Sequence, residues 1–216
     1  MFTSVILGAG KSTRMKANKS KLLFNIAGKP VINHIVSSLK DAKAKHNICV
    51  INNSSAELKK ILEAEKISFA YQKILDGTAG AVKAALKSKK NSNSKILILC
   101  GDVPFITSNS IKKLVAKLKN HDAVVGTVEL ESPKGYGRIV RVNNKFSSIV
   151  EEKETTPDER QIREVNTGII AIQENVLRKY ISLIKNNNQK KEYYITYIIK
   201  ILIDNDKKLT TFKFIN

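Results

Sequence analysis

The stretch from Leu7 to Met15, LGAGKSTRM, combines a glycine-rich turn with two cations, Lys11 and Arg14. It follows the apolar run Val5-Ile6-Leu7, which has the composition of a buried strand. A turn in that position points several backbone N–H groups into one small concavity, and such a concavity attracts anions. Glycines let a ligand approach the backbone closely, and the two cations add positive charge. These residues therefore predict a phosphate-binding turn.

Two other interpretations of this turn are open. The letters GAGKST partly match the P-loop pattern G-x-x-x-x-G-K-[ST], but the first glycine of that pattern would fall on Val5. A P-loop also runs straight into a helix, whereas the segment from Met15 to Lys21 is polar, cationic and without helical periodicity. The remaining alternative is a structural glycine turn that carries two solvated cations.

A carboxylate follows the central apolar run of the chain. Residues Ile96 to Leu99 are all apolar, as expected of a strand buried on both faces, and Cys100-Gly101-Asp102-Val103-Pro104 comes next. Ligands of open parallel sheets bind beyond the carboxyl ends of the strands, so we expect Asp102 to lie beside the glycine turn. Asp102 is therefore a candidate magnesium ligand. An aspartate that only caps a turn is the equally open alternative.

The elements around these residues follow an α/β pattern. Apolar runs of strand length alternate with amphipathic stretches, which is typical of a mostly parallel sheet covered by helices. The expected strands in this part are Thr3–Leu7, Ile48–Ile51, Ile67–Tyr71 and Ile96–Leu99. Helices are expected from Pro30, around Leu58 to Leu62, after an N-cap at Thr78, and after an N-cap at Thr107 or Ser108.

The pattern changes after Asp122. Strand-like runs follow one another with little helix between them, at Ala123–Val128, Gly137–Val142, Phe146–Val150 and Thr167–Ile172. We expect β-hairpins to insert here, with a charged loop at Glu159 to Glu164 and helices at Val176–Ile184 and Tyr194–Leu202. No repeat and no Pro-, Gly- or Ser-rich linker divides the chain, which predicts one domain over residues 1–216.

The charge of the chain raises the question of nucleic acid. The formal net charge is +19, from 38 Lys and Arg residues against 19 Asp and Glu residues. The lysines are spread over the whole sequence, and the aromatic content is 6% with no RNA-binding aromatic signature. Dispersed charge favours a solvated surface, so we expect no nucleic-acid partner.

Cysteine and hydropathy patterns bear on the compartment. Cys49 and Cys100 lie far apart in apolar runs, without the spacing of a disulfide framework or a zinc site. No apolar run approaches the ~20 residues that span a bilayer, and the first residues lack the features of a signal peptide. The sequence predicts a soluble, cytoplasmic protein with no membrane partner.

Further motifs give the whole chain a family resemblance. The stretch from Leu7 to Met15, followed by Lys21, is similar to the signature L-x-x-G-x-G-T-R-M with its downstream lysine. The other matching motifs, in chain order, are Gln72 with Gly77-Thr78, Gly101 to Pro104, Gly135 to Ile139, Ile149 to Glu151, Asn166 to Gly168, and Glu192 to Thr196. The chain thus resembles the N-terminal pyrophosphorylase (uridylyltransferase) domain of the bifunctional N-acetylglucosamine-1-phosphate uridyltransferases, within the sugar nucleotidyltransferases.

The resemblance implies a fold and a set of site residues. The implied fold is a Rossmann-like nucleotidyltransferase sheet, mostly parallel and flanked by helices, with a β-rich sugar-binding lobe. The implied catalytic residues are Arg14 and Lys21, which would hold the triphosphate, and the implied metal ligand is Asp102 for Mg²⁺. The implied nucleotide-binding residues are Leu7, Ala9, Gly10, Gln72, Gly77 and Thr78, and the implied sugar-binding residues are Gly137, Glu151, Asn166, Tyr194 and Thr196.

The implied reaction transfers UMP from UTP to N-acetylglucosamine 1-phosphate and releases pyrophosphate. Both reactants are anions, so the protein has to neutralise and align them and needs no nucleophilic side chain. His34, His46 and His121 lie outside every motif and are expected to be structural or surface residues. A related enzyme with another base or sugar is an alternative, and so is a nucleotide-sugar-binding protein of low activity.

The chain departs from the family pattern at several positions. Ser12 replaces a glycine, Ser20 a proline, Cys100 a tyrosine-like residue and Tyr197 an aspartate. Members of the family continue beyond the position of Asn216 to an asparagine that is a second magnesium ligand, and then to a β-helix acetyltransferase domain that holds family trimers together. Neither lies within these 216 residues, so we expect no acetyl transfer and a monomer.

Overall fold

A computed structural model describes residues 1–10, 20–52 and 56–215. Within these ranges nine strands form one sheet, with the order β11-β7-β10-β6-β1-β4-β5 and with β8 and β9 attached through β10. The strands of this sheet are β1 (Phe2–Leu7), β4 (His46–Ile51), β5 (Ser68–Tyr71), β6 (Lys95–Cys100), β7 (Ala123–Glu129), β8 (Arg138–Val142), β9 (Lys145–Val150), β10 (Glu164–Gln173) and β11 (Leu209–Lys213). A separate small hairpin pairs β2 (Asn25–Ile26) with β3 (Lys29–Pro30).

The middle of the sheet is parallel. Strands β5, β4, β1 and β6 run in the same direction, while β10 is antiparallel to both β6 and β7, and β11 is parallel to β7. In the register of the central pair, Leu7 at the end of β1 lies opposite Cys100 at the end of β6. The glycine turn and the Gly101-Asp102 turn therefore leave the same edge of the sheet side by side.

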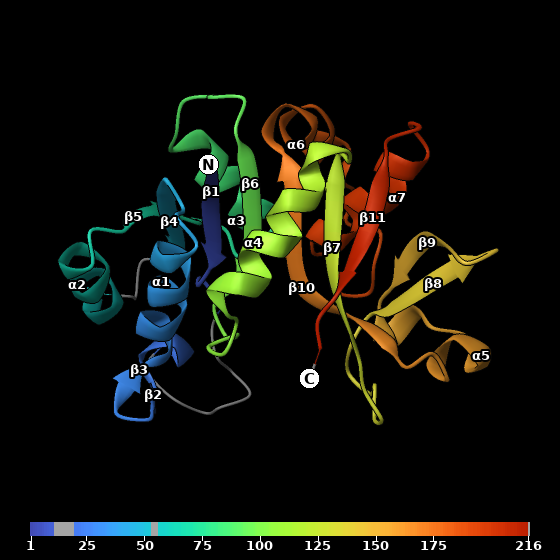
Figure 1. Ribbon diagram of the computed structural model, residues 1–216, viewed down its shortest axis with the longest axis horizontal. Coiled ribbons are helices and arrows are strands. Elements are labelled where there is room, and N and C mark those ends of the chain that lie inside the picture. Colours follow the sequence, from blue (N-terminus) through green and yellow to red (C-terminus); the bar gives the residue numbers. More distant parts are fainter. Residues whose placement is uncertain (11–19, 53–55, 216) are drawn as a thin grey trace.

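Helices cover both faces of the sheet (Figure 1). On one face lie α1 (Val31–Asp41), α2 (Ala56–Ala64) and α4 (Ser108–Ala116), and on the other lie α3 (Thr78–Lys87), α6 (Glu174–Tyr180) and α7 (Ile198–Ile203). Successive residues of a strand point to opposite faces, so Val5 of β1 packs into the core with α3 and Ile6 into the core with α1. Both side chains are fully buried, as are Ile98 and Leu99 of β6.

A hairpin lobe extends from one side of the sheet. Strands β8 and β9 pair with each other, and β8 joins the sheet where Arg138 lies opposite Val165 of β10. The short helix α5 (Pro157–Arg160) lies in the same region (Figure 1). This arrangement agrees with the expected hairpin insertion.

Three local expectations were wrong, and one strand was missed. The charged segment at Glu159 begins inside α5, because Thr156 and Glu159 cap that helix reciprocally. Thr78 is the first residue of α3 and not its N-cap, since Gly77 occupies the N-cap and the Thr78 hydroxyl accepts a hydrogen bond from Ile195 N at 2.9 Å. Tyr194 precedes the 3-10 turn Ile195–Tyr197 instead of starting a helix. Strand β11 was not expected, because its five residues alternate only weakly.

Several other expectations were confirmed. Thr107 caps α4 by accepting a hydrogen bond from Ser110 N at 3.2 Å. Cys49 and Cys100 are both free thiols. His34 and His121 each bond to a backbone carbonyl oxygen, of Ile26 and Lys117, as structural residues do. The helices in the described ranges are all too short or too polar to cross a bilayer.

Candidate active site

A cavity of about 440 Å³ opens at the carboxyl ends of β1 and β6. It contains all six residues that the resemblance assigns to nucleotide binding, together with Lys21. Its described lining is Leu7, Ala9, Gly10, Lys21, Gln72, Leu75, Gly77, Thr78, Ala81, Cys100 and Glu192. The structure thus brings together residues that are up to 185 positions apart in the chain, from Leu7 to Glu192.

The glycine turn forms one wall of the cavity. Gly8 N donates to Val50 O at 2.9 Å, and the Asn52 side chain donates to Ala9 O at 2.8 Å, so the neighbouring strand β4 holds the turn in place. A Cβ on Gly8 would lie 2.8 Å from Leu22 Cδ1, whereas a Cβ on Gly10 would meet nothing within 4 Å. Gly8 is therefore required by packing, and Gly10 borders open space. Lys11 and Arg14 lie outside the described residues.

Leu22 positions Lys21 above the two strand ends. The Leu22 side chain is fully buried, and it fills the space that a Cβ on Gly101 would need, at 2.5 Å. The Ser20 hydroxyl accepts a hydrogen bond from Leu22 N at 3.3 Å and caps the 3-10 turn that Lys21 begins. Leu22 thus packs against both glycine turns and carries the neighbouring lysine to the cavity.

Lys21 and Asp102 form an ion pair at this edge of the sheet. The Lys21 ammonium lies 2.5 Å from Asp102 Oδ2, and the side chains are 30% and 51% exposed. The two charged groups come from the turns after β1 and β6, which the strand register places next to each other. A cation and a carboxylate, both open to solvent, therefore stand at the mouth of a site where phosphates and a metal ion can reach them.

The opposite wall is a loop fastened by two backbone hydrogen bonds. Tyr193 N donates to Asp76 O at 2.6 Å, and Ala79 N donates to Tyr193 O at 2.8 Å. Gly77, between them, has φ of +111°, and a Cβ there would lie 2.6 Å from Tyr193 O. Only glycine combines that backbone conformation with this close approach. The loop and the segment around Tyr193 are therefore joined by hydrogen bonds and close packing.

The residues assigned to sugar binding form a chain of contacts beside this cavity. The Thr196 hydroxyl donates to Glu151 Oε1 at 2.6 Å, and Asn166 N donates to Gly137 O at 2.8 Å. A Cβ on Gly137 would lie 3.6 Å from Glu151 Oε2, which connects the two pairs. Tyr194 lies on the same segment as Thr196 and Tyr193. None of these five is in the described lining of the 440 Å³ cavity, but Tyr193 links them to its wall.

Burial shifts the protonation of this second group. Burial raises the pKa of Glu151, the Thr196 hydrogen bond opposes that shift, and the charge of Glu154 adds to it. Burial, followed by the nearby Glu192 carboxylate, raises the pKa of Tyr194 to about 12, so its phenol keeps its proton at neutral pH. The group therefore offers a hydroxyl donor and a carboxylate whose charge is sensitive to acid.

Cys100 lines the cavity as a protonated thiol. Burial, and then the charge of Asp102, raise the pKa of Cys100 to about 11. A thiol in that state is a poor nucleophile at neutral pH, because the thiolate is the reactive form. Its role is to pack against Gly168, where a Cβ would lie 3.0 Å from the Cys100 sulfur and where φ is +74°. Cys100 therefore does not supply a nucleophile, and the described residues of the site can contribute charged groups and the alignment of bound substrates.

Asp102 suits a magnesium ion held mainly by its substrate. Mg²⁺ prefers oxygen ligands and usually binds through one or two carboxylates with substrate phosphates and water. The Asp102 carboxylate is half exposed and lies outside the described lining of the cavity, but it pairs with Lys21, which is part of that lining. In the described part of the chain no three His, Cys, Asp or Glu side chains gather into a metal cluster. The described residues therefore do not form a metal site whose ligands are all protein side chains.

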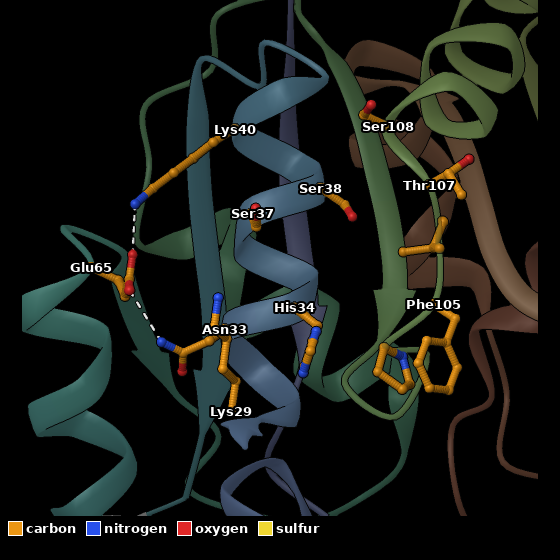
Figure 2. Close-up of a pocket in the computed structure, with 12 residues that line it drawn as sticks. Lys29, Asn33, His34, Ser37, Ser38, Lys40, Glu65, Phe105, Thr107 and Ser108 are labelled. Carbon is orange, nitrogen blue, oxygen red and sulfur yellow. Dashed lines mark hydrogen bonds and ion pairs between the residues drawn. The ribbon is translucent and has the colours of Figure 1, made fainter. Parts of the chain in front are cut away.

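A larger groove, of about 720 Å³, lies between α1 and the segment Pro104 to Ser108, so it begins where the Gly101 to Pro104 motif ends (Figure 2). Glu65 accepts hydrogen bonds there from Lys40 Nζ at 2.6 Å and from the Asn33 amide at 3.1 Å. Figure 2 shows that Lys40 and Asn33 both point toward Glu65, while His34 lies on the side of α1 that faces Phe105. The groove contains none of the residues that the resemblance assigns to the site.

Sequence reasoning missed the residues that hold the site together. Leu22 and Asn52 belong to no motif, and Tyr193 lies inside the Glu192 to Thr196 motif but was given no role of its own. The roles of all three depend on contacts with distant segments. Asp76 is the other residue missed, although it lies between two motif positions, Gln72 and Gly77. Asp76 lies two positions before Thr78, and the helix-start pattern at Thr78 indicates only a cap and gives no role to that carboxylate.

Comparisons with known proteins bear on the family. A family model described as the MobA-like NTP transferase domain matches residues 4–160. The bifunctional protein GlmU of Francisella tularensis subsp. novicida (strain U112) is 42% identical over 198 residues, which are 90% of this chain and 43% of that protein. GlmU of F. tularensis subsp. holarctica (strain OSU18) matches with the same identity and coverage. The chain therefore spans less than half the length of these curated relatives.

Solved structures share the fold. A Bacillus anthracis protein assigned as a glucose-1-phosphate thymidylyltransferase, in complex with sucrose, has a TM-score of 0.81 at 20% identity, over 100% of this chain and 87% of that one. A UDP-glucose pyrophosphorylase complexed with UDP-glucose has a TM-score of 0.74 at 16% identity, over 99% and 91%. These matches confirm the Rossmann-like nucleotidyltransferase fold, and the matches of the preceding paragraph confirm the resemblance drawn from the motifs.

Proposed function

The chain belongs to the MobA-like NTP transferase family, and on that premise we propose that it transfers UMP from UTP to N-acetylglucosamine 1-phosphate. The observation that carries the proposal is the single cavity shared by Lys21 and all six nucleotide-binding candidates. The 42% identity to GlmU proteins across 90% of the chain supports the choice of base and sugar. The products are UDP-N-acetylglucosamine and pyrophosphate.

The chemistry requires neutralisation and alignment of two anions. A phosphate oxygen of the sugar 1-phosphate attacks the α-phosphorus of UTP in line, and the bond to the pyrophosphate oxygen breaks. Charge develops on the phosphoryl oxygens, and fixed positive groups stabilise it. Lys21 supplies one such group at the cavity mouth, and Arg14 supplies a second on the strength of its motif position. The backbone of Leu7, Ala9 and Gly10, with Gln72, Gly77 and Thr78, holds the uracil and ribose.

Asp102 would hold Mg²⁺, which the nucleotidyltransferase family generally uses. A bound Mg²⁺ would neutralise phosphate charge and help to orient the triphosphate. While Lys21 and Asp102 are paired at 2.5 Å, each group neutralises the other. When substrate binds, the Lys21 ammonium therefore exchanges its Asp102 partner for a phosphate oxygen. In the substrate complex Lys21 would then bind the triphosphate, and Asp102 would bind the metal ion.

The sugar binds against the neighbouring group of residues. Glu151, Asn166 and Thr196 supply hydrogen-bonding groups for the sugar hydroxyls and the N-acetyl group, with Tyr194 and Gly137 beside them. The Tyr193 backbone joins this group to the nucleotide loop by two hydrogen bonds, so the two substrates bind on the two sides of this connection. That connection supports the alignment of attacking and leaving oxygens on which in-line transfer depends.

The first experiment measures pyrophosphate release from UTP and N-acetylglucosamine 1-phosphate, with and without Mg²⁺. Wild type and Asp102→Ala are compared, with Asp204→Ala as the matched control, because Asp204 pairs with Lys200 at 2.6 Å on the exposed surface. We expect magnesium-dependent turnover that collapses in Asp102→Ala and persists in Asp204→Ala. Binding of UDP-N-acetylglucosamine by a silent wild type would instead identify a nucleotide-sugar-binding protein, and a panel of nucleotides and sugar phosphates would reveal another base or sugar.

The proposal treats residues 1–216 as one nucleotidyltransferase domain with small-molecule substrates. The cytoplasmic location, the monomeric state and the absence of nucleic-acid and membrane partners stay predictions of the sequence. Light scattering on the purified chain tests the monomeric state, and a nucleic-acid shift assay tests the absence of a nucleic-acid partner.

A further inference from the structure

We propose that Asp76 makes the cavity selective for bases that carry a ring N–H donor, by fixing the orientation of the Gln72 amide. The inference rests on the proposed nucleotide site and deepens it. Asp76 lies outside the described lining of the cavity, so it acts through Gln72 as a positioning residue. Three features of the site support this role: the two hydrogen bonds of the amide nitrogen, the space for the carboxylate, and the hydrogen bonding left to the amide oxygen.

The Gln72 amide nitrogen uses both of its protons. Nε2 donates to Asp76 Oδ1 at 3.0 Å and to Gly77 O at 2.9 Å. The residue is only 7% exposed, so a reversed amide would place its oxygen against a carboxylate and a carbonyl with little water to compensate. The two acceptors, Asp76 Oδ1 and Gly77 O, therefore fix the amide nitrogen of Gln72 toward the protein. The oxygen is left for the cavity that Gln72 lines.

Gly80 provides the space in which the Asp76 carboxylate lies. A Cβ on Gly80 would be 1.7 Å from Asp76 Oδ1, closer than any real contact. The Asp76 backbone is held as well, because its carbonyl oxygen accepts from Tyr193 N at 2.6 Å. Asp76 precedes the N-cap of α3, and its carboxylate lies against Gly80 in the first turn, where a helix favours negative charge. Asp76 and Gly80 therefore act together. Because Gly80 has no side chain, the Asp76 carboxylate can lie where it orients the Gln72 amide.

The amide oxygen that remains can only accept a hydrogen bond. Among the described residues no donor reaches Gln72 Oε1, so a ligand can supply one. Uracil presents an N3–H donor at its ring edge, whereas cytosine presents an N3 lone pair that would face the oxygen unfavourably. A buried acceptor left without a donor discriminates strongly between such bases. The pair UTP and CTP tests this feature, since the two nucleotides differ only at that edge of the base.

The test measures the affinities of UTP and CTP by titration calorimetry for the whole chain and four variants. We expect wild type to prefer UTP, and the ratio of affinities to fall about tenfold in Asp76→Ala, the worth of one hydrogen bond. Asp76→Asn keeps an acceptor oxygen and should stay within about threefold of wild type. Gly80→Ala displaces the carboxylate while improving helix propensity, so it should lower the ratio without a loss of fold.

The double variant Asp76→Ala/Gly80→Ala gives the sharpest outcome. If both changes act through the same carboxylate, the double variant loses no more selectivity than either single variant. Additive losses, an unchanged ratio in folded Asp76→Ala, or equal binding of UTP and CTP by wild type would each overturn the inference. Pyrophosphate release distinguishes this inference from the proposed function. If UTP selectivity depends on Asp76 but no turnover occurs, the inference is supported and the transferase activity is contradicted. If turnover occurs but the UTP-to-CTP affinity ratio is unchanged in Asp76→Ala, the transferase is supported and the inference is contradicted.

Discussion

The Lys21 ammonium and the Asp102 carboxylate lie 2.5 Å apart, across the ends of the two central parallel strands. The pair is exposed enough for both partners to exchange, since exposed ion pairs contribute only about 0–1 kcal/mol to stability. Phosphate oxygens can therefore take over Lys21 at little cost, while Asp102 becomes available to a metal ion. The pair is a resting arrangement of the two groups on which the proposed reaction depends.

Replacement of Lys21 by alanine should lower kcat by about 10²- to 10³-fold, because a fixed positive group that stabilises developing phosphoryl charge is lost. The same loss is expected for Arg14→Ala, on the strength of its motif position alone. Steady-state pyrophosphate release measures both. Lys200→Ala is the matched control, since Lys200 forms a 2.6 Å pair with Asp204 on the exposed surface and should keep the wild-type rate. A near-normal kcat in folded Lys21→Ala would contradict its assignment.

Replacement of Thr196 by valine should move the acid limb of sugar binding to higher pH. Burial raises the pKa of Glu151 above its ordinary value of 4.5, and the Thr196 hydroxyl opposes that shift by donating to the carboxylate. Without this donor the pKa rises further, so the carboxylate loses its charge at a higher pH. The measurement is the KM for N-acetylglucosamine 1-phosphate as a function of pH, in wild type and Thr196→Val.

Two features make this measurement decisive. The substrate phosphate also titrates, but it does so identically with both enzymes, so only the difference between them reports on Glu151. Glu151→Gln serves as the control, because it has no carboxyl proton to gain and should lack the limb. Superimposable KM profiles for wild type and Thr196→Val would mean that the carboxylate does not contact the sugar.

Replacement of Gly77 by alanine should destabilise the protein by about 3 kcal/mol and weaken UTP binding, because φ of +111° is strained for alanine and its Cβ would lie 2.6 Å from Tyr193 O. Gly135→Ala is the matched control. Its φ is +90° and a Cβ there meets nothing within 4 Å, so it should cost only the backbone term of about 1 to 2 kcal/mol. Urea unfolding measures the free energy of unfolding of both variants. Equal losses of stability would show that the close approach of Tyr193 O to Gly77 adds nothing to the cost.

Part of this architecture could be predicted from the sequence because it depends on short-range patterns. All-apolar runs at Val5 to Leu7 and at Ile96 to Leu99 identify buried parallel strands, and the residues after them fall at the binding edge by topology. The roles of Gln72 and Glu151 came only from the family resemblance. In isolation Glu151 is a charged residue after a strand, and its partner Thr196 lies 45 positions away.

The rest depends on complementary shapes between distant segments, which periodicity does not encode. Leu22 fills the space left by Gly8 and Gly101, and Asp76 fills the space left by Gly80. Each such pair joins an ordinary residue to a glycine, so neither partner stands out by its type. The short helix α5 is a different case, since its Thr156 and Glu159 carry a recognisable capping box that the charged context obscured.

The last prediction concerns the buried carboxylate that holds α6 to the loop before β6. The Glu174 side chain has no exposed surface and accepts hydrogen bonds from Lys89 Nζ at 2.6 Å, Arg178 Nε at 2.9 Å and Ser94 Oγ at 2.9 Å. Burial alone would raise the pKa of Glu174, but the bonds from Lys89, Arg178 and Ser94 lower it to about 2. The charged form is therefore the one that the folded protein stabilises.

Replacement of Glu174 by glutamine should destabilise the protein by about 3 kcal/mol at pH 7, because it leaves two buried or half-buried cations without their partner. A depressed pKa stabilises the fold above the ordinary value of 4.5, and that stability is lost as the pH falls toward 2. The difference between wild type and Glu174→Gln in urea unfolding should thus shrink over this range. Glu63→Gln, whose exposed side chain lies 3.8 Å from Lys59, should change stability by less than about 0.5 kcal/mol at any pH. A pH-independent difference for Glu174→Gln would show that packing, and not the charge of Glu174, stabilises this corner of the fold.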